Sequence, residues 1–186
     1  MTVTDEKRLM DETDIERTLK RMTYEILDRN HCPKNLALIG LRTRGVHLAN
    51  RIASIIKSSE KVHVPVGALD VTMYRDDFRT ALKQPEVKIT TIPFDIEGIT
   101  VVIVDDVFYT GRTVRSALDA LMDFGRPARV RLAVLIDRGH RELPLVADFF
   151  GKKIKTAVNE EIRVRLKEED GSDEVTLVKL EKEGKH

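Results

Sequence analysis

The sequence predicts an α/β fold in which a mainly parallel sheet is flanked by helices. Two apolar segments rich in β-branched residues, Thr100–Val104 and Val130–Ile136, are typical of parallel strands that are covered on both faces. A helical pattern at Thr113–Phe124 lies between them, and this strand–helix alternation indicates a parallel sheet. The loop Val107–Arg112, which contains a glycine, joins the first of these strands to the helix.

The composition indicates one globular domain. The chain has 186 residues, of which 41% are hydrophobic and 34% charged, and its net charge is +1. Because the net charge is close to zero, the protein has no overall electrostatic field that would attract nucleic acids or membranes. Any such contact must therefore come from a local charged patch. The single cysteine, Cys32, excludes an internal disulfide, and its position after a helix favours a plain loop residue over a nucleophile. The N-terminus lacks a signal peptide and no apolar run is long enough for a membrane span, so we expect a cytoplasmic protein.

The first part of the chain contains signals for two helices and two strands. A capping box of Thr13 and Glu16 precedes helically spaced apolar residues, namely Ile15, Leu19, Met22, Ile26 and Leu27. Leu36–Gly40 is expected to be a buried strand, and an amphipathic helix is expected from about Val46 to Lys57. Val62–Met73 reads as a strand, which Pro65 assigns to a sheet edge or a bend.

The later elements are less regular. Tyr74–Glu97 is a long polar excursion, expected to be functional or mobile, in which the alternation Val87–Ile92 forms a hairpin arm with the preceding strand. Gly125 is expected to end the helix before it as a left-handed cap. Arg138–Lys155 is expected to be a compact arm. A last hairpin pairs Ile162–Leu166 with Val175–Leu180 around Asp170-Gly171.

The loop after the first central strand has the features of a phosphate site. A loop that enters a helix presents free backbone N–H groups and the positive end of the helix dipole. Gly111 permits the positive φ that curls these amides into an anion nest, and Thr110 and Thr113 add hydroxyl donors. Asp105 and Asp106 immediately upstream suit the hydroxyls of a ribose 5-phosphate, directly or through Mg²⁺. The alternative is that Asp106 is a turn residue and Thr113 a helix cap.

The segment Val101–Thr113 matches the phosphoribosyl pyrophosphate motif of type I phosphoribosyltransferases. The runs Asp70–Asp77 and Asp137–Pro144 resemble the corresponding segments of the bifunctional pyrimidine operon attenuator/uracil phosphoribosyltransferase family. The resemblance to this family extends over nearly the whole chain, from the first helix to the final hairpin. The resemblance implies the type I phosphoribosyltransferase fold with a small hood and a flexible lid loop. It implies a single domain over residues 1–186, with the lid at about 74–97, the hood at about 137–157 and the hairpin at about 160–181.

The resemblance also assigns roles to residues. Asp105 and Asp106 are the expected catalytic and metal-binding residues, and Mg²⁺ is the expected cofactor. The 5-phosphate would contact Val107, Tyr109, Thr110, Gly111, Arg112 and Thr113. Pyrophosphate would contact Arg42, Thr43 and Arg44, whose alternative role is a basic surface turn. The lid would include Tyr74, Arg75, Asp76 and Asp77, and the hood would place Asp137 and Arg138 near the base.

The expected reaction joins uracil to phosphoribosyl pyrophosphate and gives UMP and pyrophosphate. Regulators of this family also bind messenger RNA under the control of UMP or UTP, and the RNA-binding candidates are Arg17, Lys20, Arg21, Tyr24, His140, Arg141 and Lys152. Tyr24 stands where the family usually has a His, and Val146 where it usually has an Arg. The alternatives are an RNA-binding regulator with vestigial catalysis, a transferase without RNA binding, and a transferase for another base. The family forms dimers and larger assemblies, so a homo-oligomer is expected.

Overall fold

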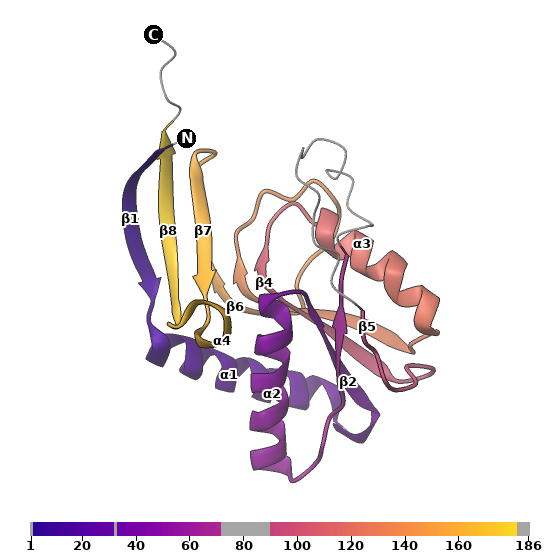
Figure 1. The fold of residues 1–186 in the computed structure, drawn as a ribbon. Coiled ribbons are helices and arrows are strands. Elements are labelled where there is room, and N and C mark those ends of the chain that lie inside the picture. The colour runs from indigo at the N-terminus through magenta and orange to yellow at the C-terminus, as the bar shows by residue number, and fades with distance from the viewer. Residues whose placement is uncertain (1, 32, 72–89, 182–186) are drawn as a thin grey trace.

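The computed structural model describes residues 2–31, 33–71 and 90–181 of the chain (Figure 1). Its helices and strands are β1 (Thr2–Met10), α1 (Glu12–Asn30), β2 (Leu36–Leu41), α2 (Arg44–Glu60), β3 (Val66–Leu69), β4 (Thr100–Phe108), α3 (Arg112–Leu121), β5 (Arg129–Asp137), β6 (Phe149–Lys153), β7 (Glu160–Arg165), α4 (Lys167–Asp170) and β8 (Glu174–Glu181). Among the described residues, no helix is both long and apolar enough to cross a bilayer.

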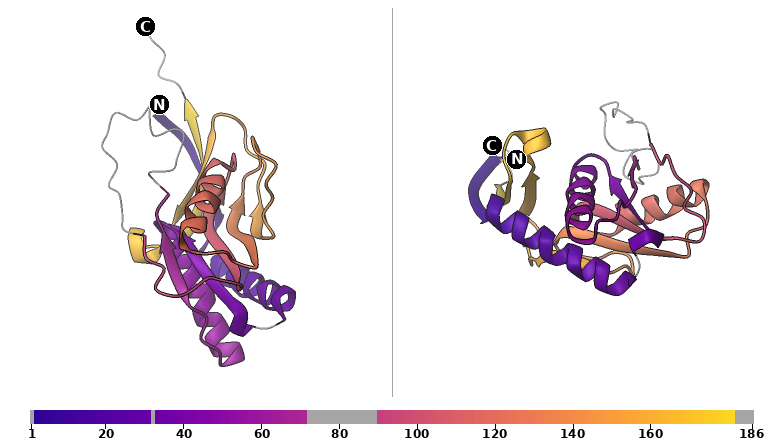
Figure 2. Two further views of the ribbon diagram at one scale, coloured as in Figure 1. Left: turned by 90° about the vertical axis from the view of Figure 1, so that its right-hand side faces the viewer. Right: turned by 90° about the horizontal axis from the view of Figure 1, so that it is seen from below.

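The main sheet of the described chain has five parallel strands in the order β3-β2-β4-β5-β6. Helices α1 and α2 cover one face and α3 covers the other, as the two views of Figure 2 show. The two apolar segments that predict the fold form the middle of the sheet, where β4 pairs with β5 from Thr100 opposite Arg129 to Phe108 opposite Asp137. The predicted α/β fold with a mainly parallel sheet is therefore confirmed.

Strand β4 contributes side chains to both faces of the sheet. Val102 and Val104 pack in the core beneath α1 and α2, whereas Val101 and Ile103 pack in the core beneath α3. Successive side chains of a strand point to opposite faces, and both faces are covered here, so every position is apolar. The same alternation continues beyond Val104 and determines where the polar end of the strand points.

Two glycines bring the start of α2 against the sheet. A Cβ on Gly40 would lie 2.3 Å from the Cα of Val46, and a Cβ on Gly45 would lie 2.4 Å from the carbonyl oxygen of Val104. No side chain fits at these distances, so glycine is required at both positions. The first turn of α2 is thereby fixed next to the carboxyl end of β4.

A second, three-stranded antiparallel sheet in the described chain has the order β1-β8-β7 (Figure 1). Helix α1 runs beneath both sheets and joins them (Figure 2). The predicted C-terminal hairpin is confirmed, with Ile162 opposite Leu177. Its connection is not a tight turn but the short helix α4, which ends at Gly171 with a φ of 77°.

Several predicted boundaries are wrong. Helix α1 is capped by Asp11, whose carboxylate accepts the Asp14 amide at 2.9 Å, so the capping box is formed by these two residues and not by Thr13 and Glu16. Gly125 ends a 3₁₀ turn, Met122–Phe124, with a φ of 143° and a ψ of −176°, outside the left-handed helical region. The first error arises because several polar residues near the start of a helix can cap it. The second arises because the last turn before Gly125 is 3₁₀ and not α-helical.

Strands β3 and β6 differ from what the sequence predicted. Within residues 62–71, the described part of the predicted strand Val62–Met73, the structure forms only the short β3, which is an edge strand of the main sheet, as Pro65 suggested. Ala68 exchanges two backbone hydrogen bonds of 2.8 Å with Thr91, so the end of the predicted Val87–Ile92 arm does pair with this strand, while residues 72–89 lie outside the described residues. The arm after Arg138 contains β6, which pairs with β5 from Ala133 opposite Phe149.

Candidate active site at the carboxyl edge of the parallel sheet

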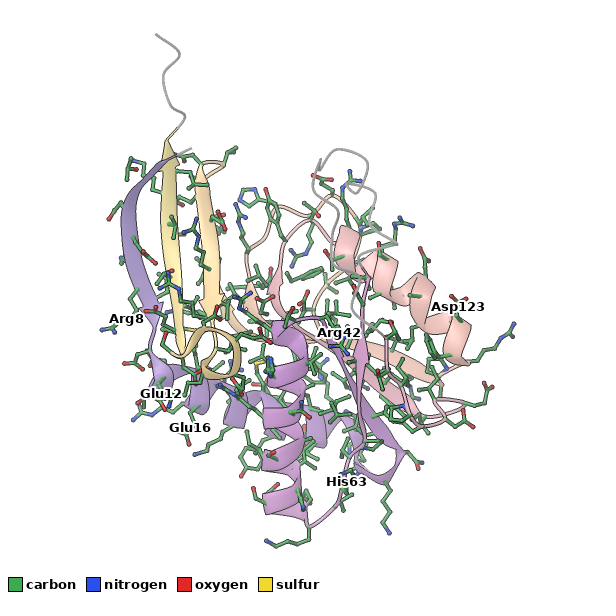
Figure 3. All side chains as sticks on the ribbon, in the orientation of Figure 1. Arg8, Glu12, Glu16, Arg42, His63 and Asp123 are labelled. Atoms are coloured by element: carbon green, nitrogen blue, oxygen red, sulfur yellow. The ribbon has the colours of Figure 1, made fainter. Side chains whose placement is uncertain are left out.

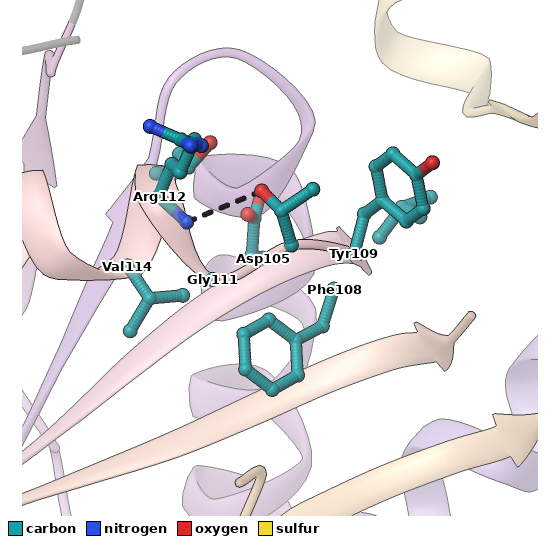
Figure 4. Close-up of a pocket in the computed structure, with 9 residues that line it drawn as sticks. Asp105, Phe108, Tyr109, Gly111, Arg112 and Val114 are labelled. Carbon is teal, nitrogen blue, oxygen red and sulfur yellow. Dashed lines mark hydrogen bonds between the residues drawn. The ribbon is translucent and has the colours of Figure 1, made fainter. Parts of the chain in front are cut away.

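The turn between β4 and α3 has the geometry of an anion site. Gly111 precedes α3 with a φ of 95°, and no side chain caps the helix from this position. Residue Asp105 and residues 107–114 line a cavity of about 340 Å³ at this helix end (Figure 4). The structure therefore brings the predicted phosphate-binding residues together around the N-terminus of α3, where backbone amides favour an anion.

Asp105 and Asp106 belong to the last residues of β4 and line different cavities. Asp105 lines the cavity at α3, whereas Asp106 lines a cavity of about 290 Å³ with Arg44, Asp170 and strand β7. This separation follows from the alternation of side chains along β4. The backbone N–H of Asp106 donates to the Asp105 carboxylate at 3.0 Å, and that of Val107 donates to the Asp106 carboxylate at 2.9 Å.

Burial raises the pKa of Asp106 above its usual value. The Val107 amide, Asp105 and the positive charge of Arg44 act in the opposite direction, but they do not cancel the loss of solvation. An ionised Asp106 is therefore an anion that gains from any donor or cation brought to it. This is the property expected of a group that binds hydroxyls or a metal ion.

The predicted pyrophosphate loop lies between β2 and α2. Arg42, labelled in Figure 3, directly follows β2 and donates its backbone N–H to the Leu69 carbonyl at 3.0 Å. The Arg42–Thr43 peptide bond is cis. Arg44 is the first residue of α2, and its guanidinium donates to the Asp170 carboxylate from Nε at 3.1 Å and from Nη2 at 2.8 Å. The loop thus lies at the same sheet edge as Asp106, with Arg44 already bound to a carboxylate.

Residues at the end of β5 and in the predicted hood after it contact the loop between β4 and α3. Asp137, which is buried, accepts from Arg141 at 2.5 Å, and the same arginine donates to the carbonyl oxygens of Tyr109 and Phe108. The Arg138 guanidinium lies 4.0 Å from the centre of the Tyr109 ring and donates to the Thr156 hydroxyl at 2.9 Å. His140 contacts the Thr156 carbonyl at 2.8 Å. These contacts hold the hood and the phosphate loop as one unit.

A basic cavity of about 340 Å³ lies on the hood beside Asp137. Its lining residues include Arg138, Arg141, Lys153 and Lys155, together with Val146, which is 81% exposed. Lys153 and Lys155 do not figure among the residues predicted for the site, because a lysine in an irregular arm carries no distinctive signal.

The predicted RNA-binding residues fall into three groups with different surroundings. Arg21 donates to the carbonyl oxygens of Phe150 and Gly151 at 3.0 and 2.6 Å, so it fastens α1 to β6. Lys152 donates to the Leu9 carbonyl at 3.2 Å. Arg17, Lys20 and Tyr24 are exposed on α1, with Tyr24 at 55%, while His140 and Arg141 are part of the hood contacts described above.

The structure also shows a cluster of acidic residues that was not predicted from the sequence. Glu168, Glu169, Asp170 and Asp173 lie in the connection between β7 and β8 and face basic side chains of α2. The signal was a spacing: Arg44, His47 and Arg51 recur on one side of a predicted helix, and an acidic cluster follows the penultimate strand. Tyr74, Arg75, Asp76 and Asp77 of the predicted lid lie outside the described residues.

Comparisons with known proteins agree with this geometry. A phosphoribosyl transferase domain is recognised over residues 6–169. The bifunctional protein PyrR of Roseiflexus sp. (strain RS-1) is 56% identical over 175 residues, which cover 94% of this chain and 96% of that protein. That of Listeria monocytogenes serotype 4b (strain F2365) is 53% identical over 173 residues, covering 91% and 94%.

Among solved structures, a hypoxanthine phosphoribosyl transferase of Trypanosoma cruzi aligns with a TM-score of 0.71 at 21% identity, covering 93% of this chain and 91% of that chain. A 1.4 Å structure of the Trypanosoma cruzi enzyme gives a TM-score of 0.70 at 20% identity, covering 94% and 97%. At this identity the likeness concerns the fold alone. The domain match and the relatives above half identity together show that the chain belongs to the phosphoribosyltransferase family and, within it, to the group of the bifunctional PyrR proteins.

Proposed function

We propose that this protein transfers the ribose phosphate of phosphoribosyl pyrophosphate to uracil and releases UMP and pyrophosphate. The observation that carries the proposal is the cavity at the N-terminus of α3, with Gly111 at a φ of 95° and Asp105 on its wall. A phosphate at the helix end and a carboxylate at the strand end match the two ends of a ribose 5-phosphate. The name of the relatives, bifunctional protein PyrR, fits a protein with this activity and a second one.

In this mechanism the protein supplies binding and position and forms no covalent intermediate. The 5-phosphate accepts hydrogen bonds from the amides of the loop 107–113. Asp105, from the side of the cavity at α3, and Asp106, from the side of the cavity that holds Arg44, accept from the ribose hydroxyls at the end of β4. The bond between C1 of the ribose and the pyrophosphate oxygen breaks, and pyrophosphate departs with that electron pair. Uracil N1 bonds to C1 and releases its proton to water. Fixing both reactants removes much of the entropic barrier, and the carboxylates stabilise the positive charge that develops on the ribose.

The leaving group would be bound at the loop that holds Arg42, Thr43 and Arg44, because this loop opens at the same sheet edge as Asp106. Asp137 and Arg138 would border the base, since the hood contacts place Arg138 over Tyr109 beside the phosphate loop. We assign Tyr74, Arg75, Asp76 and Asp77 to a lid that excludes water from the reacting carbon.

The described residues fit Mg²⁺ as a cofactor bound together with the substrate. They contain no group of three or more His, Cys, Asp or Glu side chains able to hold a metal ion alone. Mg²⁺ commonly uses one or two carboxylates and completes its shell with substrate oxygens and water, and Asp105 and Asp106 provide such a pair. When bound with phosphoribosyl pyrophosphate, the ion would neutralise charge on the departing pyrophosphate.

The test is a base screen. Uracil, cytosine, hypoxanthine, guanine and orotate are each incubated with phosphoribosyl pyrophosphate and Mg²⁺, and nucleotide formation is followed by chromatography. We expect turnover with uracil and a loss of turnover on chelation. Turnover with a purine in preference to uracil would contradict the proposal, as would a complete lack of nucleotide product.

We propose RNA binding, controlled by UMP or UTP, as the second function, because the relatives are named as bifunctional. The supporting surface is the exposed part of α1, with Arg17, Lys20 and Tyr24, together with Lys152, His140 and Arg141. Lysine and arginine contacts to phosphates make RNA affinity fall with salt, and an exposed tyrosine can stack on an unpaired base. The expected target is the leader of a pyrimidine operon, and the expected assembly is a homodimer or larger oligomer in the cytoplasm.

The RNA test compares a double variant on the exposed part of α1 with a control variant on α2. Arg17→Ala with Lys20→Ala should reduce affinity for the leader and make the slope of log K against log[salt] less negative by about one for each phosphate contact removed. Lys57→Ala on the exposed part of α2 is the control and should leave RNA affinity unchanged. Binding of unrelated RNA with equal affinity, or no response to UMP, would leave only the transferase.

A further inference from the structure

Three basic residues of α2 bind acidic residues of the connection between β7 and β8. Arg44 binds Asp170, as described above, and His47 lies 2.8 Å from Glu169. Arg51 donates to both Glu168 and Asp173, with distances from 2.6 to 2.9 Å. Their spacing of three and four residues puts the basic side chains on one side of the helix. The acidic segment 168–173 therefore lies along the first two turns of α2.

Asp170 differs from the other acidic residues of the segment because its partner, Arg44, lies in a cavity with Asp106. Arg44, Asp170 and Asp106 line one cavity, of about 290 Å³. Arg44 is close enough to Asp106 for its charge to lower the pKa of that carboxyl, so the guanidinium has a carboxylate on two sides. Among the residues that the structure describes, Asp170 forms the two-point ion pair with it, through Nε and Nη2.

The Arg44 guanidinium can change its direction only by rotation of the side chain, because the start of α2 is fixed. Gly45, the next residue, is pressed against the Val104 carbonyl, so the start of α2 cannot shift towards β4. Asp170 is itself held, because its carboxylate also accepts the Leu166 backbone N–H at 2.9 Å. A fixed acceptor with two oxygens matches a planar guanidinium, and it directs the arginine away from other acceptors.

We propose that Asp170 is a positioning residue that keeps the Arg44 guanidinium off Asp106 and so keeps the Asp106 carboxylate available to the ribose. The cavity also contains Glu161, but after Asp170 the charge of Asp106 acts most strongly on Arg44, so Asp106 is the expected partner once Asp170 is removed. An ion pair between Arg44 and Asp106 would occupy the group that must accept from the ribose, and it would remove the arginine from the leaving group. The proposal rests on the proposed transferase function for its consequence, and on the shared cavity for the pairing itself.

The remaining pairs of the segment explain its stabilising role and provide a control. Glu168 belongs to the same helix α4 and also binds an arginine of α2 through two oxygens, but Arg51 does not line the cavity with Asp106. The side chains of Glu168 and Asp170 are 35% and 22% exposed. Glu168→Gln therefore removes a comparable ion pair without changing the surroundings of Arg44.

The experiment compares Asp170→Asn, Asp170→Glu and Glu168→Gln in the full chain. Binding of phosphoribosyl pyrophosphate with Mg²⁺ and binding of UMP are measured by calorimetry, and crystal structures of the variants are determined without ligand. For Asp170→Asn we expect Arg44 within hydrogen-bond distance of Asp106, and affinity for both ligands reduced about tenfold, the loss of one charge-assisted contact. Asp170→Glu should restore part of the affinity. Glu168→Gln should change thermal stability but neither affinity.

Two results on the single variants would overturn the proposal. One is an Asp170→Asn structure in which Arg44 stays away from Asp106, and this result holds whether or not a ligand binds. The other is equal ligand affinity in Asp170→Asn and Glu168→Gln. Failure of the wild-type protein to bind phosphoribosyl pyrophosphate would instead count against the proposed function, while the crystallographic comparison would still decide the role of Asp170. In an Arg44→Gln background, Asp170→Asn should have no further effect on UMP affinity, and an additive loss would also contradict the proposal.

Discussion

Two groups of carboxylates lie on either side of the start of α2, and their electrostatic surroundings are opposite. At the end of β4, burial raises the pKa of Asp106. In the connection between β7 and β8, hydrogen bonds from Arg44 and Arg51 lower the pKa values of Asp170 and Glu168. The first group loses solvation without full compensation, whereas the second is satisfied by protein partners. Arg44 pairs with Asp170 of the second group, and its charge lowers the pKa of Asp106 without cancelling the effect of burial.

The largest effect should come from the carboxylates of β4. Asp105→Asn with Asp106→Asn should lower kcat/KM for phosphoribosyl pyrophosphate by about 100-fold or more, because each charge-assisted contact contributes about 1.5–3 kcal/mol. The fold should persist, since only charge changes and the Asp106 carboxylate is not stabilised by its surroundings. Steady-state kinetics and a thermal melt check both statements. Unchanged kinetics would make the pair structural and would erase the contrast.

The anion nest should be nearly as sensitive. Gly111→Val should lower UMP affinity by about tenfold or more, because a β-branched residue does not adopt a φ of 95° without distorting the loop. Space is not the obstacle, since a Cβ would lie 3.4 Å from the nearest atom of Leu143. Gly98→Val, at a φ of 70° and with nothing within 4 Å of its Cβ, is the matched control for backbone strain away from the site. Equal UMP affinity in the two variants would argue against the nest.

Substitution of Arg51, in the ion pairs between α2 and the connection from β7 to β8, should lower stability and leave catalysis unchanged. Arg51→Ala leaves Asp173, whose side chain is 6% exposed, without its arginine. The free energy of unfolding should fall by about 2–3 kcal/mol, as expected when one partner of a largely buried ion pair is removed. Urea denaturation measures this loss, and kcat/KM at low temperature should stay near the wild-type value. A large drop in kcat/KM would mean that the two carboxylate groups are not separate in function.

The smallest effect is a pH-dependent one. Glu168→Gln should reduce stability at neutral pH by about 0.5–1 kcal/mol, because the pair is partly exposed and screened. Arg51 lowers the pKa of Glu168 below 4.5, so the ionised carboxylate stabilises the fold above that pH, and the contribution is lost as pH falls through the lowered pKa. The difference between wild type and variant should therefore shrink below pH 4.5. A difference independent of pH would assign the effect to packing.

The same contrast explains how far the sequence could predict the molecule. Asp105-Asp106 follows an uninterrupted apolar strand and precedes a glycine loop, so local pattern was enough to place it at the edge of a parallel sheet. Glu168–Asp173 reads as a polar turn, and its role depends on α2, whose residues are more than a hundred positions away. The basic spacing on α2 and the acidic cluster are each visible in the sequence, but nothing local to either segment shows that the two pair.

The missed strands have physical reasons as well. The residues of β1 from Asp5 to Arg8 are polar and exposed, so no hydrophobic alternation marks them, and the strand exists because β8 offers it an edge. Strand β6 contains a glycine that is required because a Cβ on Gly151 would lie 2.4 Å from the Leu135 carbonyl. Glycine in a short segment lowers strand propensity, so tertiary packing decided that element.

The pairing of β1 with β8 has a consequence for biosynthesis. Met10 lies opposite Val175, so β1 cannot pair with β8 until Val175 has been synthesised. At translation rates of about 5–20 residues per second, β1 would wait on the order of 8–30 seconds. Its charged residues suit such a wait, because an unpaired apolar strand would invite aggregation. Ribosome-bound chains halted before β8 should therefore expose β1 to protease even when the parallel sheet has already formed.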